Sequence, residues 1–248
     1  MRFPHFKLFL SATLLTLAVP AHAADRASVP APQLSEGDSW ILDQTHERGQ
    51  NGFSKQRIDL KIERVSPDNM VVGAKPDGAP TDFVDHIGGL DWSQRRILND
   101  KETTTARPLS FPLKVGKTWV VDFNDPRTRG LITSTHVHST YKVVGWQDVT
   151  VPAGKFRAIE IEMNGTLEAK MAATSSITGG AAVAAGESGA AMRTTSLGPR
   201  TVSALTYSEI YYVPSIKYFV KTLDEQYNSD NVRIRRDSQE LISFKLNP

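Results

Sequence analysis

Two histidines lie one residue apart in the segment STHVHSTYKVVGW (residues 134–146), at His136 and His138. Paired imidazoles can bind zinc, but a zinc site needs a third protein ligand and neighbouring groups that orient all three. The candidates for that ligand are His46, His86 and Asp125. No spacing in the sequence places any of them beside the histidine pair. We therefore predict no metal site, and we expect the two histidines on the exposed face of a strand.

A short internal repeat supports the exposed-strand interpretation. GDSWILD (37–43) recurs as GKTWVVD (116–122), and the segments IDLKI (58–62) and STYKV (139–143) that follow also correspond. The row of side chains that contains the histidines matches the charged row of the first copy, which comprises Lys55, Arg57, Asp59 and Lys61. The repeat indicates two related β units.

One cluster resembles the start of a general-base site. DFVDHIGG (82–89) places Asp82, Asp85 and His86 close together ahead of two glycines. A histidine acts as a base only when a partner orients it and a substrate lies within hydrogen-bond reach. Aspartate and histidine are also common in turns, where they bond their own backbone. We interpret the cluster as part of a loop.

A pair of carboxylates is the last candidate for acid–base chemistry. Glu160 and Glu162 lie two residues apart and so share one face of a predicted strand. The opposite face is apolar and carries Ile159, Ile161 and Met163. The glutamates are therefore predicted to form the outward row. Since the chain also lacks a G-x-S-x-G elbow, an H-E-x-x-H motif, a P-loop and a dinucleotide glycine fingerprint, we predict no catalytic residues, no cofactor and no enzymatic activity.

The first 23 residues have the pattern of a cleaved signal peptide. Arg2 and Lys7 precede the apolar run Leu8 to Val19, and Ala21-His22-Ala23 matches a cleavage site. The apolar run is too short to cross a bilayer, so we expect no transmembrane anchor in the mature protein. The chain has no cysteine, which excludes disulfides and a lipid anchor on a cysteine. These features predict an exported protein, periplasmic or secreted.

The mature chain is close to neutral. Removing Arg2 and Lys7 from the 29 basic residues leaves 27, against 27 acidic residues. Nucleic-acid binding requires clustered lysine and arginine to neutralise phosphates. We therefore predict no nucleic-acid partner.

Short alternating segments between turn residues predict an all-β fold. QRIDLKIERV (56–65) alternates apolar and charged residues, and VPAG (151–154) has the proline and glycine of a tight corner between two strands. Three long strands are predicted at the end of the chain, at 201–214, 216–228 and 231–247. We expect a single antiparallel domain over residues 37–248, arranged as a curved sheet, an open barrel or a sandwich, with apolar rows facing a shared interior.

Two segments depart from the strand pattern. Residues 24–36 are rich in proline, alanine and serine, and we predict a disordered lead-in. Residues 172–198 are almost entirely alanine, glycine, serine and threonine, which bury little area on ordering. We predict a flexible loop there, with two functional alternatives: a lid over an apolar cavity, or a segment that orders on a partner.

Several motifs together resemble an uncharacterised family of bacterial envelope proteins, the domain of unknown function 3108 and its relatives. They are GDSWILD, GKTWVVD, VTVPAGKFRAIEIE (149–162) and YYVPSIKYFVKTLDE (211–225). The resemblance spans residues 37 to 225 and implies a secreted, β-rich protein. The chain has Ser215, Ile216 and Lys217 where the family pattern implies a glycine-containing turn. The family supplies no catalytic residues.

These inferences lead to two expectations of function. The first is a non-catalytic periplasmic binding or chaperone-like module for a lipid, another apolar small molecule or an envelope component, because the mouths of β-barrels often form apolar cavities. Its ligand-binding residues are not indicated by the sequence. The alternative is a structural or interaction protein of the cell envelope that contacts a protein partner through exposed strand edges or residues 172–198.

Overall fold

The computed structural model describes residues 28–49, 52–184 and 187–247. The predicted signal peptide, residues 1–23, lies outside this part of the chain. No helix among the described residues is long and apolar enough to span a membrane.

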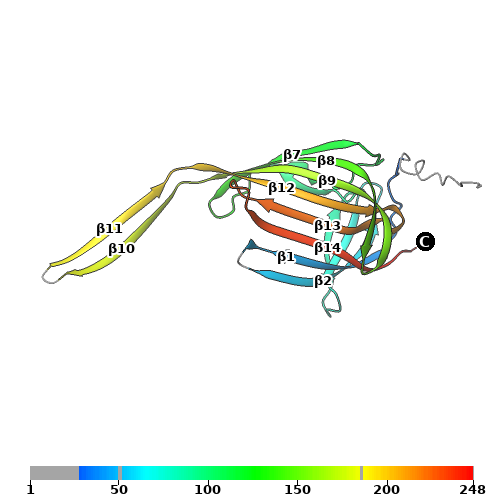
Figure 1. Ribbon diagram of the computed structural model, residues 1–248, viewed down its shortest axis with the longest axis horizontal. Helices are drawn as coiled ribbons and strands as arrows, with labels where there is room; N and C mark the ends of the chain where they lie inside the picture. Colours follow the sequence, from blue (N-terminus) through cyan, green and yellow to red (C-terminus); the bar gives the residue numbers. More distant parts are fainter. Residues whose placement is uncertain (1–27, 50–51, 185–186, 248) are drawn as a thin grey trace, which may run out of the picture.

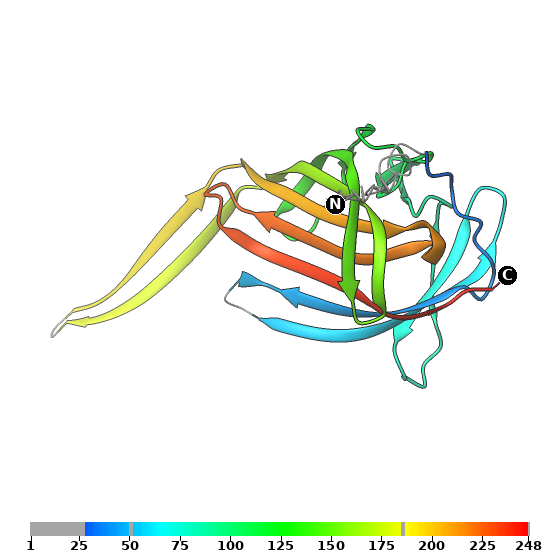
Figure 2. The same ribbon diagram turned by 45° about the vertical axis from the view of Figure 1, so that its right-hand side comes forward.

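A single antiparallel sheet of twelve strands wraps into a nearly closed barrel (Figure 1; Figure 2). Its order is β6-β5-β4-β3-β2-β1-β14-β13-β12-β9-β8-β7, and the edge strands β6 and β7 approach each other to close the wall. The strands are β1 Ser39–Glu47, β2 Phe53–Val65, β3 Met70–Pro76, β4 Val84–Gly88, β5 Gln94–Leu98, β6 Lys101–Ala106, β7 Thr118–Asp125, β8 Ile132–Val151, β9 Gly154–Met171, β12 Arg200–Val213, β13 Tyr218–Tyr227 and β14 Arg233–Lys245. The all-β prediction and its open-barrel alternative are confirmed.

The predicted corner at VPAG is a tight hairpin between β8 and β9. Val151 pairs with Gly154, and Pro152 and Ala153 make the turn. Gly154 has φ of 136°, a backbone conformation that side chains with a Cβ rarely adopt. The three long strands predicted at the end of the chain are also confirmed, since β12, β13 and β14 are neighbours in the sheet.

The two copies of the repeat have the same backbone pairing. Gly37 and Gly116, with φ of 84° and 85°, each donate a backbone hydrogen bond into the partner strand, to the carbonyls of Ile62 and Val143. Trp40 of β1 then lies opposite Leu60 of β2, as Trp119 of β7 lies opposite Tyr141 of β8. The structure therefore contains the two related β units that the repeat indicated.

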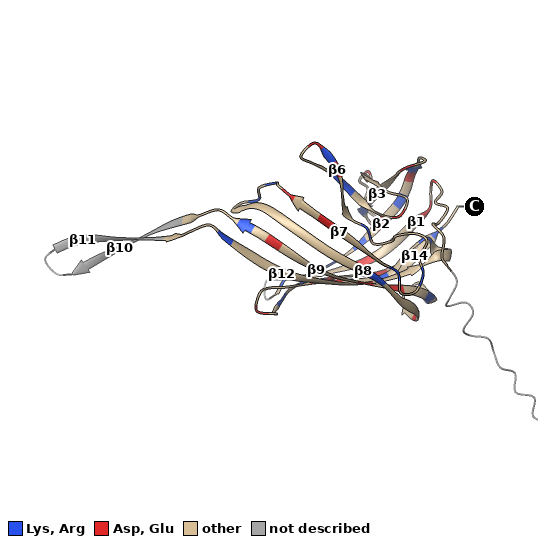
Figure 3. Ribbon diagram, turned by 90° about the horizontal axis from the view of Figure 1, so that it is seen from above, with Lys and Arg blue, Asp and Glu red and all other residues tan. Residues whose placement is uncertain are grey.

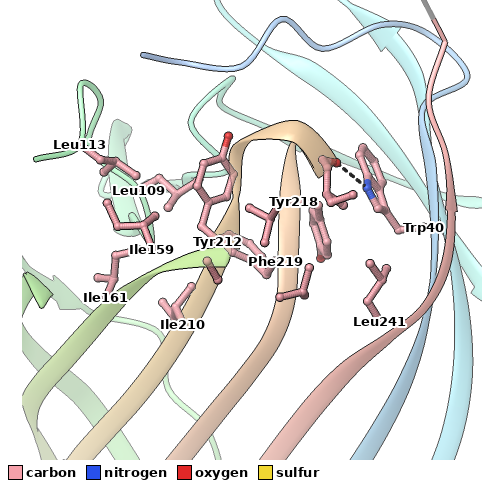
Figure 4. Close-up of a cluster of buried hydrophobic side chains, with 14 of the residues drawn as sticks. Trp40, Leu109, Leu113, Ile159, Ile161, Ile210, Tyr212, Tyr218, Phe219 and Leu241 are labelled. Atoms are coloured by element: carbon pink, nitrogen blue, oxygen red, sulfur yellow. Dashed lines mark hydrogen bonds between the residues drawn. The ribbon is translucent and has the colours of Figure 1, made fainter. Parts of the chain in front are cut away.

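One end of the barrel is filled by a dense apolar core (Figure 4). The ring of Trp40 stacks on Tyr218, with centroids 5.0 Å apart, and its indole Nε1 donates to the carbonyl of Ile216 at 2.9 Å. The loop between β6 and β7 brings Leu109 and Leu113 over the same end, and both are fully buried. Such packing closes this end of the barrel to water.

Part of the predicted lead-in also covers this end. Val29 is buried and forms a β-bridge with Leu113, with backbone hydrogen bonds of 2.8 Å in both directions. Leu34 packs against the core. Residues 28–36 therefore pack on the barrel, where the sequence predicted a disordered lead-in, because their two aliphatic side chains cover the core and their backbone finds a partner.

The late turn, where a glycine was expected, places a lysine in the left-handed conformation. Pro214–Ile216 form one turn of 3₁₀ helix, and Lys217 follows with φ of 61° and ψ of 11°. Its ammonium Nζ reaches the fully buried carboxylate of Asp38 at 2.9 Å. The side chain thus supplies an ion pair that glycine could not.

Most of residues 172–198 forms a two-stranded ribbon instead of an irregular loop. β10 (Thr174–Ala184) and β11 (Glu187–Leu197) pair antiparallel and project from the barrel as an extension of β9 and β12 (Figure 1). A two-stranded ribbon needs backbone hydrogen bonds rather than a buried core, so a composition poor in large apolar residues does not prevent it. Whether this ribbon is flexible stays a prediction.

Candidate binding site

The inside of the barrel contains a cavity of about 610 Å³. It lies beyond the apolar core, toward the end from which the ribbon β10–β11 projects. Eight strands and the segment after β6 contribute its lining residues, which are Gln94, Arg96, Thr105, Ala106, Pro108, Phe123, Val137, Ser139, Tyr141, Met163, Leu167, Thr206, Ser208, Ile210, Tyr218, Phe219, Thr222, Asp224, Glu225, Gln226, Arg235 and Gln239. This volume lies in the range of small-molecule sites.

The strand register divides the interior into a polar and an apolar wall. Residues directly opposite each other in paired strands share a face, so a row of partners can be followed around the barrel. One row runs through Gln56, Gln44, Gln239, Thr222, Ile210, Ile161 and Val143, from β2 to β8. The next row runs through Ser54, His46, Asp237, Asp224, Ser208, Met163, Tyr141 and Trp119. In both rows the side chains are polar from β2 to β13 and apolar from β9 to β7.

Three glutamines of the polar wall form a hydrogen-bonded chain. The Nε2 of Gln56 donates to Oε1 of Gln44 at 3.2 Å, and the Nε2 of Gln44 donates to Oε1 of Gln239 at 3.1 Å. Each amide both donates and accepts, so the chain can extend to further partners at either end. This network fixes the side-chain orientations of the wall.

Asp237 is the centre of a second network beside the glutamines. Its Oδ1 lies 2.9 Å from Nδ1 of His46 and also accepts from the guanidinium of Arg48, while its Oδ2 accepts from Nε of Arg235 at 2.6 Å. Burial acts to raise the pKa of Asp237, but the hydrogen bonds from Arg48 and His46 lower it overall. The charge of this carboxylate is therefore compensated within the wall.

The negative charge of Asp224 is compensated less than that of Asp237. Asp224 lies opposite Asp237 in the register, and its Oδ1 accepts a hydrogen bond from the hydroxyl of Ser208, which is itself buried. Among the described residues, no lysine, arginine or histidine forms an ion pair with it. Burial raises the pKa of Asp224, against the effect of the Ser208 hydrogen bond. The cavity thus contains a carboxyl group whose charged form is disfavoured.

The apolar wall is made by aromatic and aliphatic side chains of β7, β8 and β9. Trp119 stacks on Tyr141 with centroids 5.3 Å apart and planes 3° from parallel, and the Trp119 indole donates to the carbonyl of Arg107 at 2.8 Å. Phe123, Val137 and Leu167 continue this wall toward the mouth. The two walls together suit a molecule with one apolar and one polar part.

His136 and His138 lie outside this cavity, on the outer face of β8. The exposed fractions of their side chains are 38% and 46%, as the sequence predicted. Both contact Asp122 of β7: the Asp122 Oδ2 lies 2.7 Å from Nδ1 of His138 and 3.3 Å from Nε2 of His136. These hydrogen bonds, that of His138 first, lower the pKa of Asp122.

The three candidates for a further metal ligand lie elsewhere. His46 is on the inner face, His86 is exposed on β4, and Asp125 binds Arg127. Within the described residues, no group of three or more histidine, cysteine, aspartate or glutamate side chains could hold a metal ion. The structure therefore brings none of the three candidates to the histidine pair.

Asp125 makes a testable contribution to stability. Hydrogen bonds from Arg127, including Nε to Oδ1 at 2.8 Å, lower its pKa from 3.8 to about 2. A carboxyl whose folded-state pKa is depressed stabilises the fold above its unfolded pKa, and this contribution is lost as the pH falls toward about 2. We expect Arg127→Ala to lower the free energy of unfolding by about 1 kcal/mol at neutral pH, because the pair is near the surface.

Urea denaturation across pH measures this effect. The difference between Arg127→Ala and the unaltered protein should shrink as the pH falls from 4 to about 2. Arg129→Ala is the matched control, since Arg129 is more exposed and lies 4.0 Å from Asp125. A difference independent of pH would show that Arg127 acts through packing instead.

The cluster at 82–89 lies partly on a strand and not wholly on a loop. Asp85 and His86 belong to β4, where His86 pairs with Val72 of β3, and strand alternation turns adjacent residues to opposite faces. Asp82, Asp85 and His86 are all exposed. In the part of the chain that the structure describes, these side chains form no hydrogen bond or ion pair with one another, so no base is oriented there.

Glu160 and Glu162 are on the outer face of β9, as predicted. They lie opposite Tyr211 and Glu209 of β12, and the hydroxyl of Tyr211 donates to Glu160 at 3.2 Å. Ile161 of the opposite face is fully buried. Figure 3 shows acidic and basic residues interspersed along the strands seen from this side.

The sequence reasoning missed the polar wall. Polarity alone assigns a side chain to the outside of a strand, whereas the structure places these residues on the inner face: Gln44, His46, Gln56, Asp224 and Gln239. A usable signal was present: the inward rows of β1, β2 and β14 each change from apolar to polar part-way along the strand, at Leu42 to Gln44, Ile58 to Gln56 and Leu241 to Gln239.

No protein-family model matches the sequence, and no curated protein matches it. The resemblance to the domain of unknown function 3108 therefore stays a prediction.

Three solved structures align with most of the chain at low identity. The first, from Parabacteroides distasonis and provisionally described as a lipoprotein, is 13% identical with a TM-score of 0.43, covering 89% of this chain and all of that one. A Bacteroides fragilis protein, provisionally described as exported with a YmcC-like fold, is 11% identical with a TM-score of 0.37. The alignment covers 88% of this chain and all of that one. The hypothetical lipoprotein YmcC from Escherichia coli is 9% identical with a TM-score of 0.32. The alignment covers 84% of this chain and 85% of that one. At these values the likenesses carry no argument about the ligand or activity of this chain.

Proposed function

We propose that this protein is a non-catalytic, exported binding module that takes an amphipathic small molecule into its barrel. The observation that supports the proposal is the division of a cavity of about 610 Å³ into an apolar wall on β7–β9 and a polar wall on β13, β14 and their neighbours. A purely apolar ligand would leave the side chains of Gln226 and Thr222 on the polar wall without partners, which is costly. The N-terminal pattern supports export, and the periplasm is the compartment we propose.

A binding titration tests this function. The mature protein, residues 24–248, is mixed with the neutral fluorescent amphiphile N-phenyl-1-naphthylamine, whose emission rises in an apolar site. We expect saturable binding at one site per chain, with a dissociation constant in the micromolar range, and displacement by detergents below their critical micelle concentrations. Native mass spectrometry of gently purified protein should detect a co-purified amphiphile. Absence of both signals would contradict the proposal.

The alternative, an interaction protein of the envelope, is favoured by one observation. The ribbon β10–β11 projects away from the barrel and is a separate two-stranded sheet, so both of its edges are free of the main sheet (Figure 1). Exposed edges can pair with a strand of another protein. Replacing residues 174–197 by a short glycine-serine turn should abolish capture of such a partner while ligand binding in the barrel persists; altered ligand exchange would instead indicate a lid.

A further inference from the structure

We propose that the polar wall of the cavity is a subsite for an uncharged, hydroxyl-rich head group, such as a sugar, on an amphiphile. This inference rests on the proposed function and specifies its ligand class. It follows from which polar groups of the lining are already satisfied and which remain free.

The arginine and the aspartate at the centre of the polar wall, Arg235 and Asp237, are engaged with each other. Nε of Arg235 donates to Oδ2 of Asp237 at 2.6 Å, and Oδ1 of Asp237 lies 2.9 Å from Nδ1 of His46. A head group with a full charge would have to compete with these pairs. Arg96, which also lines the cavity, is exposed on β5 and forms no ion pair with a described residue.

Among the uncharged lining groups, amides and a hydroxyl are left free. Gln226 of β13 is half-buried, lines the cavity, and makes no side-chain hydrogen bond to any residue that the structure describes. The side chains of half-buried Thr222 and exposed Gln94 also line the cavity and form no hydrogen bond to a described residue. Each such group can donate and accept at once, which matches a hydroxyl group on a ligand. A site built to bond hydroxyls discriminates strongly against analogues that lack them.

Asp224 fits a neutral head group better than a cationic one. One of its oxygens already accepts from Ser208, which leaves acceptor capacity for one or two ligand hydroxyls. Burial disfavours its charged form, and Arg235 acts on it as a nearby positive charge. Arg235 would repel a ligand ammonium group, whereas a hydroxyl donor carries no charge for it to repel.

The lining also includes aromatic side chains beside these polar groups. Tyr141, Tyr218 and Phe219 line the same cavity, as does Phe123. Sugar rings present C–H groups on one face and hydroxyls around the rim, so they can pack on an aromatic ring while bonding to neighbouring amides. The apolar wall beyond leaves room for an alkyl chain.

A series of amphiphiles with one chain and different heads tests the inference. n-Octyl β-glucoside, octyl sulfate, octylammonium and 1-octanol are each used to displace N-phenyl-1-naphthylamine from the mature protein. We expect the glucoside to compete at least about tenfold better than the other three, a difference of about 1.4 kcal/mol. Equal competition by all four, or preference for the sulfate through Arg96 or for the ammonium through Asp224, would overturn the inference and leave the proposed function standing.

Variants locate the subsite. Gln226→Leu should weaken glucoside binding about tenfold and leave octanol binding unchanged, whereas Gln147→Leu, on the exposed surface of β8, should change neither. Asp224→Asn keeps an acceptor for hydroxyls and should change glucoside binding less than about threefold. Unchanged glucoside binding in Gln226→Leu would overturn the inference. If the fluorescent probe does not bind and no amphiphile co-purifies, the proposed function fails, and this inference fails with it.

Discussion

Replacing Lys217 by methionine should lower the free energy of unfolding by about 3–5 kcal/mol, because it leaves a buried carboxylate without its cation. Asp38 is fully buried, and Lys217 Nζ lies 2.9 Å from its Oδ2. The same carboxylate accepts the backbone N–H groups of Ser35, at 2.9 Å, and Asn247, at 2.8 Å. The pair therefore joins the first turn of the barrel, the late 3₁₀ turn and the C-terminal residues.

Two controls separate the ion pair from other effects of the substitution. Lys221→Met, which removes an exposed pair with Glu240 at 3.1 Å, should cost less than about 1 kcal/mol. Lys217→Gly relieves the left-handed backbone at φ of 61° but also removes the ammonium group. We expect it to be destabilised in urea denaturation as well. A Lys217→Gly protein more stable than the unaltered one would show that backbone strain outweighs the ion pair.

The predictions from sequence succeeded where local geometry decides the outcome. The alternation of 56–65 and the proline and glycine of 151–154 specify strands and a tight corner whatever surrounds them. The repeat predicted the placement of His136 and His138 on the outer face because Trp40 and Trp119 set the same register in both units. A two-residue period is enough to separate the two faces of a strand.

The two-residue period does not say which face of a strand is exposed to water. In β1 the inward row contains Trp40 and Leu42, then Gln44 and His46, and polarity alone would place the last two outside although they continue the same alternating row. The assumption that a protein interior must be apolar holds for a packed core. A barrel with a cavity can keep polar side chains inside if they form hydrogen bonds with one another. The partners of Gln44 are 12 residues away on one side and 195 on the other. Only the closed sheet brings them together.

The ribbon at 174–197 was missed for a related reason. Its composition says correctly that little apolar area is available, which argues against a packed domain. It says nothing about whether β9 and β12, which pair along most of their length, continue pairing beyond the barrel. The continuation follows from the neighbours of the segment, not from its own residues.

Filling the cavity should abolish ligand binding without unfolding the protein. Thr206 and Thr222 lie on neighbouring strands, β12 and β13, and both line the cavity. In the double variant Thr206→Trp/Thr222→Trp, two indole rings would occupy the space that the ligand needs. We expect affinity for N-phenyl-1-naphthylamine to fall at least about 100-fold, which corresponds to about 2.8 kcal/mol. Overpacking costs about 1–3 kcal/mol in a filled core and should cost less where space is free.

Thr140→Trp is the matched control, because its side chain lies on the outer face of β8 between Val120 and Asn164. It should bind the probe like the unaltered protein. Circular dichroism and urea denaturation establish that both variants are folded before binding is compared. If the double variant is folded and still binds with unchanged affinity, the ligand sits outside the barrel, and the exposed edges of β10 and β11 become the better candidate for the function of this protein.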